Sequence, residues 1–258
     1  MDPFNDSLPS PPPWHPGVMS AGETVEWLPT DTKEVFDKLM NNPEHREYFE
    51  AKGWDQPGAI TYRINKYGFR CSDFALNTKS VVALGCSYTQ GIGLPIDTLW
   101  PELVGKQLDL TVYNLAWAGT SSDTCFMLAK YWLPVLRPSL VVMAAPPKNR
   151  FDIIRVAGYP ELQTIMPHTT TGEFGNDAMV KHWLTNERNH DLNNAKNKLA
   201  IQALCSNLGI DCLTYDAHEF FARSREEVEY ARDHMHAGPK GHRMFAERIL
   251  DDWRKKHA

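Results

Sequence analysis

From Lys79 onward, the hydrophobic residues of this chain alternate between two spacings. Short apolar runs without polar interruption, such as Val81–Leu84, are typical of parallel strands that are covered on both faces. Between them stand longer segments in which apolar residues recur every three or four positions, as in a helix with one buried face. The predicted strands are Val81–Leu84, Thr111–Leu115, Ser139–Ala144 and Asp211–Tyr215, and the predicted helices are Asp97–Leu108, Ser122–Leu136, Leu192–Asn207 and Pro239–Lys255. This alternation predicts an α/β fold, a three-layer sandwich with a central parallel sheet and right-handed crossovers.

The residues before this alternation have a different character. Nine of the 18 prolines lie in residues 1–57, and the Pro-rich start predicts an extended arm over residues 1 to about 22. A short helical pattern follows, which Thr30 or Asp31 is expected to cap. Residues 1–75 are therefore interpreted as an N-terminal Pro-rich arm and a packed extension.

The predicted α/β domain, residues 76–258, contains one long irregular connection. Residues 151–190 carry several Gly, Pro and Thr residues and no strong hydrophobic period. A connection of this length in a compact domain is commonly a functional lid or an insertion. Because it follows the third strand, at the carboxyl end of the sheet, we expect a lid-like insertion that walls a pocket.

Composition and charge narrow the classes of partner. A net charge of −5 gives no electrostatic reason to expect nucleic acid or an anionic membrane. The amino terminus lacks the basic and apolar regions of a secretory signal, and no apolar run reaches membrane-spanning length. A cytoplasmic location is therefore expected, although a viral gene would look no different. The five cysteines form no CxxC pair, which favours reduced structural thiols. The sequence leaves the oligomeric state open.

Small and polar residues end the first predicted strand abruptly, in Gly85-Cys86-Ser87. In open α/β sheets the ligand crevice lies at the carboxyl ends of the strands, so Ser87 is expected at the rim of a site. A serine nucleophile needs a base and a group that orients the base. Asp233 and His236, three residues apart before the last helix, offer both in one loop. These residues alone leave open that Ser87 is a helix cap.

Together these segments resemble the motif blocks of the SGNH hydrolases, also called the GDSL esterase/lipase family. GCSYTQG is similar to the first block, with Cys86 in place of the usual aspartate, and DHMH at 233–236 is similar to the last block, Asp-x-x-His. NLAWAG at 114–119 resembles the second block. The resemblance covers roughly residues 61–255. It implies the flavodoxin-like SGNH hydrolase fold and a catalytic triad of Ser87, His236 and Asp233.

The resemblance also implies an oxyanion hole. Its donors would be the backbone amides of Ser87 and Gly119 and the side chain of an asparagine from the third block, Gly-x-Asn-Asp. Here the third strand ends AAPPKNRFD, so Asn149 is the candidate, without the usual Gly and Asp neighbours. Cys86 could itself be a nucleophile, but the resemblance places the attacking atom on Ser87 and makes Cys86 structural.

Further residues near these blocks are candidates for ligand contacts. Tyr88 and Trp117 are candidates for lining an acyl or sugar pocket, with packing as the alternative, and Arg150 is a candidate for meeting an anionic group. His234 and His236 form an H-x-H pair, but no accompanying carboxylate-histidine motif favours a metal site. We expect neither a metal nor a cofactor.

Two functions stay open. The first is a serine esterase acting on a small-molecule or carbohydrate ester, with an acetyl or another small acyl group. The second is a catalytically weakened SGNH-like module that binds carbohydrate or another ligand, suggested by Cys86 and the altered third block. A flavodoxin-like nucleotide binder is disfavoured, because the first turn lacks a phosphate-cradling pattern such as GxGxxG.

Overall fold

The centre of the molecule is a parallel sheet of four strands in the order β4–β3–β5–β8. The strands are β3 (Ser80–Leu84), β4 (Thr111–Asn114), β5 (Leu140–Ala144) and β8 (Asp211–Tyr215). The structure is a computed structural model that describes residues 8–154, 162–167, 178–227 and 229–258. Val82 of the central strand β3 lies opposite Tyr113 of β4 and Val141 of β5. The predicted parallel sheet is confirmed.

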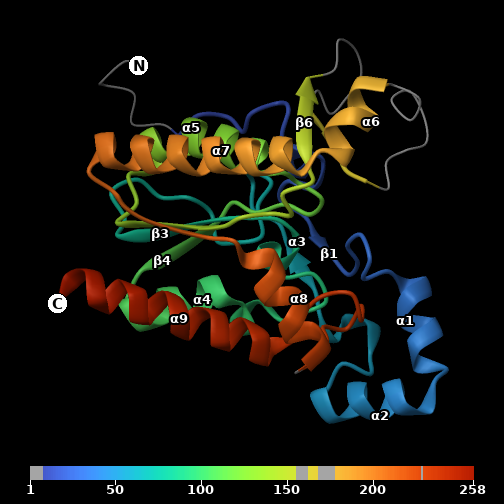
Figure 1. Cartoon of the computed structure of the whole chain (residues 1–258). Coiled ribbons are helices and arrows are strands. Elements are labelled where there is room, and N and C mark those ends of the chain that lie inside the picture. Colours follow the sequence, from blue (N-terminus) through green and yellow to red (C-terminus); the bar gives the residue numbers. More distant parts are fainter. Residues whose placement is uncertain (1–7, 155–161, 168–177, 228) are drawn as a thin grey trace.

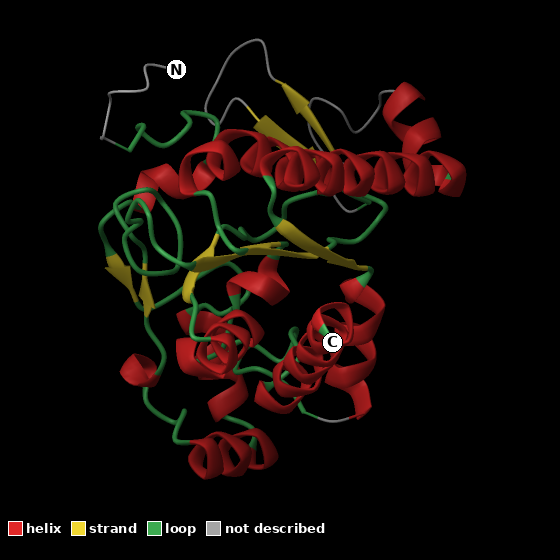
Figure 2. Cartoon of the chain, turned by 90° about the vertical axis from the view of Figure 1, so that its left-hand side faces the viewer, coloured by secondary structure: helices red, strands yellow, loops and turns green. Residues whose placement is uncertain are grey.

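Helices cover both faces of the sheet and complete the predicted three-layer sandwich (Figure 1). One face carries α5 (Ser122–Leu136) and α7 (Glu187–Leu208), and the other carries α4 (Trp100–Leu108), α8 (Ala217–Glu227) and α9 (Pro239–His257). Figure 2 shows the sheet nearly edge-on between these layers.

The central strand explains the uninterrupted apolar run in the sequence. Val82 and Leu84 join the core beneath α5 and α7, whereas Val81 and Ala83 join the core beneath α4 and α9. All of β3 is buried. Because both faces of the strand are buried, Val81–Leu84 are all apolar and their sequence shows no alternation. The one polar residue of β3, Ser80, stands at its start.

Helix ends differ from the predictions where local structure decides them. α4 begins at Trp100 rather than Asp97, because Ile96–Thr98 forms a separate 3-10 turn. α7 begins well before the predicted Leu192, since the side chain of Asn186 caps it. None of the helices in the described part of the chain combines the length and the apolar character that a membrane crossing requires.

The N-terminal residues form small elements at one end of the domain (Figure 1). These elements are 3-10 turns at Pro16–Ser20 and Pro57–Ala59, strands β1 (Thr24–Val25) and β2 (Tyr62–Arg63), and helices α1 (Lys33–Met40) and α2 (Pro43–Lys52). Their apolar side chains form a third core with Leu94 and Leu99. Within the predicted arm, His15 is buried and stacks on Phe69 with ring centroids 4.3 Å apart. This part of the arm therefore packs on the domain.

The cap of α1 corrects a prediction. The N-cap is Thr32, whose side chain accepts the amide of Val35 at 3.3 Å. Thr30 and Asp31, the predicted candidates, do not cap the helix. Both instead bond residues of the loop that carries Asp233. All three residues are good N-caps, so the local sequence could not choose among them.

The predicted lid-like insertion contains a hairpin and a helix among its described residues. β6 (Phe151–Ile154) pairs with β7 (Leu162–Ile165) in antiparallel fashion, and α6 (Ala178–Thr185) precedes α7. The rest of the insertion, residues 155–161 and 168–177, lies outside the described residues. Asp152 accepts the hydroxyls of Thr124 and Thr164, which fastens the hairpin to α5.

Candidate active site

The turn after β3 brings Ser87 to the carboxyl end of the sheet. Ser87 is the first residue of the short helix α3, which ends at Gln90, and Cys86 is its N-cap. Only glycine fits at Gly85, because a Cβ there would lie 2.2 Å from Oγ1 of Thr89 and 2.9 Å from a backbone oxygen of β5. This close packing fixes the direction in which the chain leaves the sheet.

His236 lies between Ser87 and Asp233. Its Nε2 is 2.8 Å from Oγ of Ser87, and its Nδ1 is 2.6 Å from Oδ2 of Asp233. His236 is 7% exposed and Asp233 is 2% exposed, so water competes little for these contacts. With the imidazole proton on Nδ1, Nε2 presents its lone pair to the serine hydroxyl, as a general base must. The fold thus joins the three residues named from the sequence in one hydrogen-bonded chain.

The carboxylate of Asp233 is surrounded by donors. Oδ1 accepts the amides of Met235 at 3.0 Å and His236 at 3.1 Å, and Oδ2 also accepts the hydroxyl of Thr30 at 2.6 Å. Burial by itself raises the pKa of Asp233, but the hydrogen bonds from His236 and Thr30 outweigh it and hold the pKa below its ordinary value. The site therefore holds an ionised carboxylate that can stabilise an imidazolium. Sequence reasoning missed Thr30, which stands in the N-terminal extension.

Neither the backbone amide of Ser87 nor that of Gly119 donates to a backbone acceptor in the described part of the chain. Gly119 has φ of 75°, in the left-handed region that glycine adopts without steric cost. Cε of Met166, at the end of the hairpin, lies 3.6 Å from the position that a Cβ on Gly119 would take. These are the two amides that the resemblance assigns to an oxyanion hole.

The loop that carries Gly119 is tied to α3 by side-chain hydrogen bonds. Oε1 of the fully buried Gln90 accepts the amide of Ala118 at 2.9 Å. Nδ2 of Asn114 donates to the carbonyl oxygen of Thr89 at 2.7 Å. Asn114 therefore braces this turn. Sequence reasoning missed Gln90, for which the only signal was its place one helical turn after the serine.

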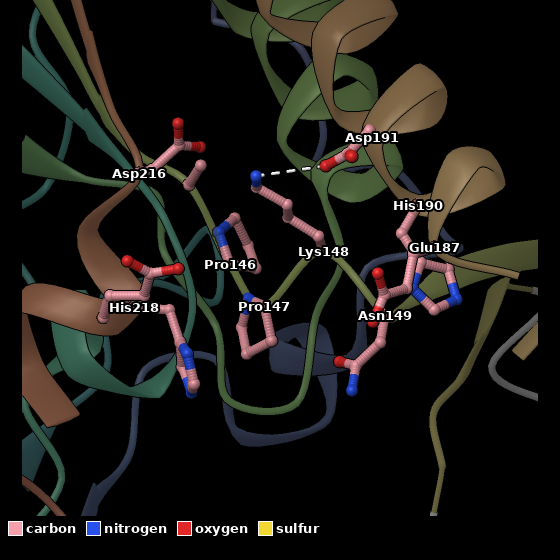
Figure 3. Close-up of a pocket in the computed structure, with 11 residues that line it drawn as sticks. Pro146, Pro147, Lys148, Asn149, Glu187, His190, Asp191, Asp216 and His218 are labelled. Carbon is pink, nitrogen blue, oxygen red and sulfur yellow. Dashed lines mark hydrogen bonds and ion pairs between the residues drawn. The ribbon is translucent and has the colours of Figure 1, made fainter. Parts of the chain in front are cut away.

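A cavity of about 430 Å³ opens beside the carboxyl ends of β5 and β8 (Figure 3). It is lined by Ala145, Pro146, Pro147, Lys148, Asn149, Glu187, His190, Asp191, Asp216, His218 and Glu219. Lys148 and Asp191 form an ion pair at 3.1 Å, and Asn149 and His218 extend on the side of the cavity away from it. Asn149 therefore lies on the cavity wall, and its role as a third oxyanion donor stays a prediction.

The three candidate substrate contacts have different surroundings. The ring of Tyr88 meets that of His236 edge-on at 4.8 Å, so Tyr88 lies beside the site. Trp117 packs edge-on against an aromatic ring of the N-terminal segment. The guanidinium of Arg150 donates to the carbonyl oxygen of Thr120 at 3.2 Å, and Thr120 directly follows Gly119 in the chain. Substrate contact stays a prediction for all three.

Cys86 and His234 do not join the hydrogen-bonded chain. Cys86 is buried, with 4% of its surface exposed. The ring of His234 stacks on Tyr230 at 5.1 Å and meets His45 of α2 at 4.2 Å, and burial lowers its pKa. Across the described ranges, no group of three or more His, Cys, Asp and Glu side chains is arranged to hold a metal ion.

No protein-family model and no curated protein matches this sequence. Among solved structures, the chain is similar to TesA (TM-score 0.37, 13% identity), with 67% of this chain and 97% of that chain covered. It is also similar to the acetyl xylan esterase Est2A from the rumen bacterium Butyrivibrio proteoclasticus (0.38, 14%), over 71% and 66% of the two chains. A third is a member of the lipolytic G-D-S-L family from Veillonella parvula (0.35, 14%; 67% and 97%). At such low TM-scores and identities, these likenesses assign no activity to this chain.

Proposed function

We propose that this chain is a serine esterase of the SGNH hydrolase type, which hydrolyses the ester of a small acyl group, such as an acetyl group on a carbohydrate. The observation that carries the proposal is the hydrogen-bonded chain from Ser87 through His236 to Asp233 at the carboxyl end of a parallel sheet. The motif blocks that surround these residues support the same reading.

The first half of the proposed reaction acylates Ser87. Its Oγ attacks the ester carbonyl carbon while Nε2 of His236 takes the hydroxyl proton. Asp233 keeps the other imidazole proton on Nδ1 and stabilises the imidazolium. The tetrahedral intermediate then expels the alcohol oxygen, which receives the proton from Nε2, and an acyl ester of Ser87 remains.

The second half releases the acid. His236 takes a proton from water, the water oxygen attacks the acyl carbon, and Ser87 leaves with the proton that Nε2 returns. In both halves the carbonyl oxygen becomes negative. The amides of Ser87 and Gly119 are the proposed donors to it, with Asn149 as the candidate third, and each donor contributes about 100-fold or more to the rate.

The polar lining of the cavity near the proposed triad favours an ester whose leaving group is a polar alcohol. The ring of His218 on its wall is 6.1 Å from that of Tyr88, which in turn contacts His236. Most of the lining is charged or polar, including the carboxylates of Glu187 and Glu219. A lipid chain would desolvate these groups without replacing their hydrogen bonds, whereas sugar hydroxyls would replace them.

Covalent labelling with a fluorophosphonate probe, together with hydrolysis of p-nitrophenyl acetate, tests the proposal. The probe should label wild type at Ser87, and Ser87→Ala should take no label and lose more than about 1,000-fold in kcat. Cys86→Ala, at the neighbouring position, is the matched control and should keep both the labelling at Ser87 and the hydrolysis of p-nitrophenyl acetate. Labelling at Cys86 would contradict the proposal. A folded, unlabelled wild type that binds carbohydrate would instead support the weakened binding module.

A further inference from the structure

The carboxylate of Asp233 receives a hydrogen bond from outside its own loop. Oγ1 of Thr30, in the N-terminal extension, donates to Oδ2 at 2.6 Å, and Nδ1 of His236 lies at the same 2.6 Å from that oxygen. The backbone amides of the loop occupy Oδ1. Thr30 is therefore the only side chain besides His236 that bonds this carboxylate within the described ranges.

The backbone at Thr30 is unfavourable for its residue type. Thr30 has φ of 76°, in the left-handed region, and stands in a tight turn closed by a hydrogen bond from the Leu28 amide to the Asp31 carbonyl. A β-branched residue in this region is an outlier that costs on the order of 1–3 kcal/mol, and glycine or asparagine is usual there. Such strain persists only where the surroundings hold it, and here the hydroxyl bonds the carboxylate next to His236.

A buried ion pair fastens the same turn to the same loop. Asp31 accepts two hydrogen bonds from the guanidinium of Arg232, at 2.7 and 3.0 Å, and neither side chain is more than 1% exposed. The hydroxyl of Tyr62 also donates to Asp31. Two consecutive residues of the turn, Thr30 and Asp31, thus bond two consecutive residues of the loop, Asp233 and Arg232. The ion pair holds the turn next to the loop, and the hydroxyl of Thr30 then lies within hydrogen-bond distance of the Asp233 carboxylate.

We propose that Thr30 is a positioning residue for the esterase reaction: its hydroxyl holds the Asp233 carboxylate in the orientation and ionised form that align His236 with Ser87. This inference rests on the proposed function. It means that the N-terminal extension contributes a residue to the proposed active site. The motif blocks that suggest catalysis all lie later in the sequence than Thr30.

Among the described residues, the other charged or titratable groups beside Asp233 and His236 include those of His234, Arg232 and His242. His234, in the same loop, lies close enough to sense the charge of Asp233. The side chain of Arg232 is turned to the buried ion pair. His242 of α9 lies near His236, and burial lowers its pKa to about 3, so it is neutral in the working range. Apart from His236 itself, Thr30 is therefore the side-chain donor whose removal should change the orientation and pKa of the Asp233 carboxylate.

The test compares Thr30→Val, Thr30→Ser and the matched control Thr32→Val in the full chain. Val keeps the β-branched shape and removes the hydroxyl, so kcat for p-nitrophenyl acetate should fall about 10-fold, as expected for a lost hydrogen bond to a charged group, with KM within about twofold. Ser restores the hydroxyl and should recover most of kcat. Thr32→Val removes the α1 cap and should leave kcat unchanged.

A second readout does not depend on activity. The carboxyl ¹³C resonance of Asp233, assigned by its loss in Asp233→Asn, should titrate at higher pH in Thr30→Val than in wild type and should not move in Thr32→Val. A kcat for Thr30→Val within twofold of wild type, or an equal loss in Thr32→Val, would overturn the inference. If wild type hydrolyses no ester and takes no probe, the proposed function fails, and an unmoved carboxyl titration would then also reject Thr30 as the group that holds Asp233.

Discussion

Gln90 links the helix of Ser87 to the loop of Gly119, and its replacement by Met should separate stability from activity. Gln90 is fully buried, and its Oε1 accepts the amide of Ala118 at 2.9 Å. Its Nε2 has no partner among the described residues. Met has nearly the same length and volume, so the change leaves the packing of α3 intact and removes only the two polar atoms.

The two polar atoms have opposite effects on the free energy of unfolding. Loss of the bond leaves the Ala118 amide without its acceptor and destabilises by about 1–3 kcal/mol, whereas removal of a buried, unpartnered amide nitrogen stabilises by about 1–3 kcal/mol. The net change should therefore be small. The proposed catalysis has no such compensation, because the amide of Gly119, a proposed oxyanion donor, directly follows the freed residue Ala118. Deletion of an oxyanion donor costs about 100-fold or more, so a misplaced donor should lower kcat by between about 10-fold and 100-fold.

Urea unfolding and steady-state hydrolysis of p-nitrophenyl acetate measure the two effects on the same preparations. Gln107→Met, on the exposed face of α4, is the matched control and should change neither. Unchanged stability with lowered kcat in Gln90→Met is the expected result. A kcat within twofold of wild type would refute the view that Gln90 places the Gly119 amide, and a loss of several kcal/mol in stability would refute the compensation.

Three further results are expected. If Asn149 supplies the third oxyanion donor, Asn149→Ala should lower kcat about 100-fold at constant KM, and an unchanged kcat would remove it from the site. Burial lowers the pKa of His15 to about 4 and of His242 to about 3, so the unfolded chain binds more protons below the ordinary value of 6.5. Urea unfolding should therefore show stability falling between pH 6.5 and 4, by about 3 kcal/mol for each histidine, and a Gln at either position should flatten the slope. The lowered pKa of Asp233 stabilises the fold above the ordinary value of 3.8, and this contribution is lost as the pH falls through the folded value. The stability advantage of wild type over Asp233→Asn should thus shrink only below about pH 4, and a decline already at pH 6 would contradict this assignment.

The sequence by itself determined the layers of the molecule. Runs such as Val81–Leu84 indicated strands buried on both faces, and the helical spacing between them indicated the covering layers. It also named the residues that the fold brings within hydrogen-bond distance at the sheet edge, Ser87, Asp233 and His236. Each of these inferences depended on neighbouring residues, or on short motifs whose spacing is fixed within one turn or loop.

The tertiary structure decided which partner each ambiguous polar residue takes. Thr30, Asp31 and Thr32 are all suitable helix caps by sequence, yet only Thr32 caps α1, while the other two bond residues about 200 positions away. Gln90 likewise became important only when the fold placed Ala118 against it. Local propensity depends on adjacent residues and can be predicted from them. A hydrogen bond between segments far apart in the sequence forms only after whole elements have packed and brought the two segments together.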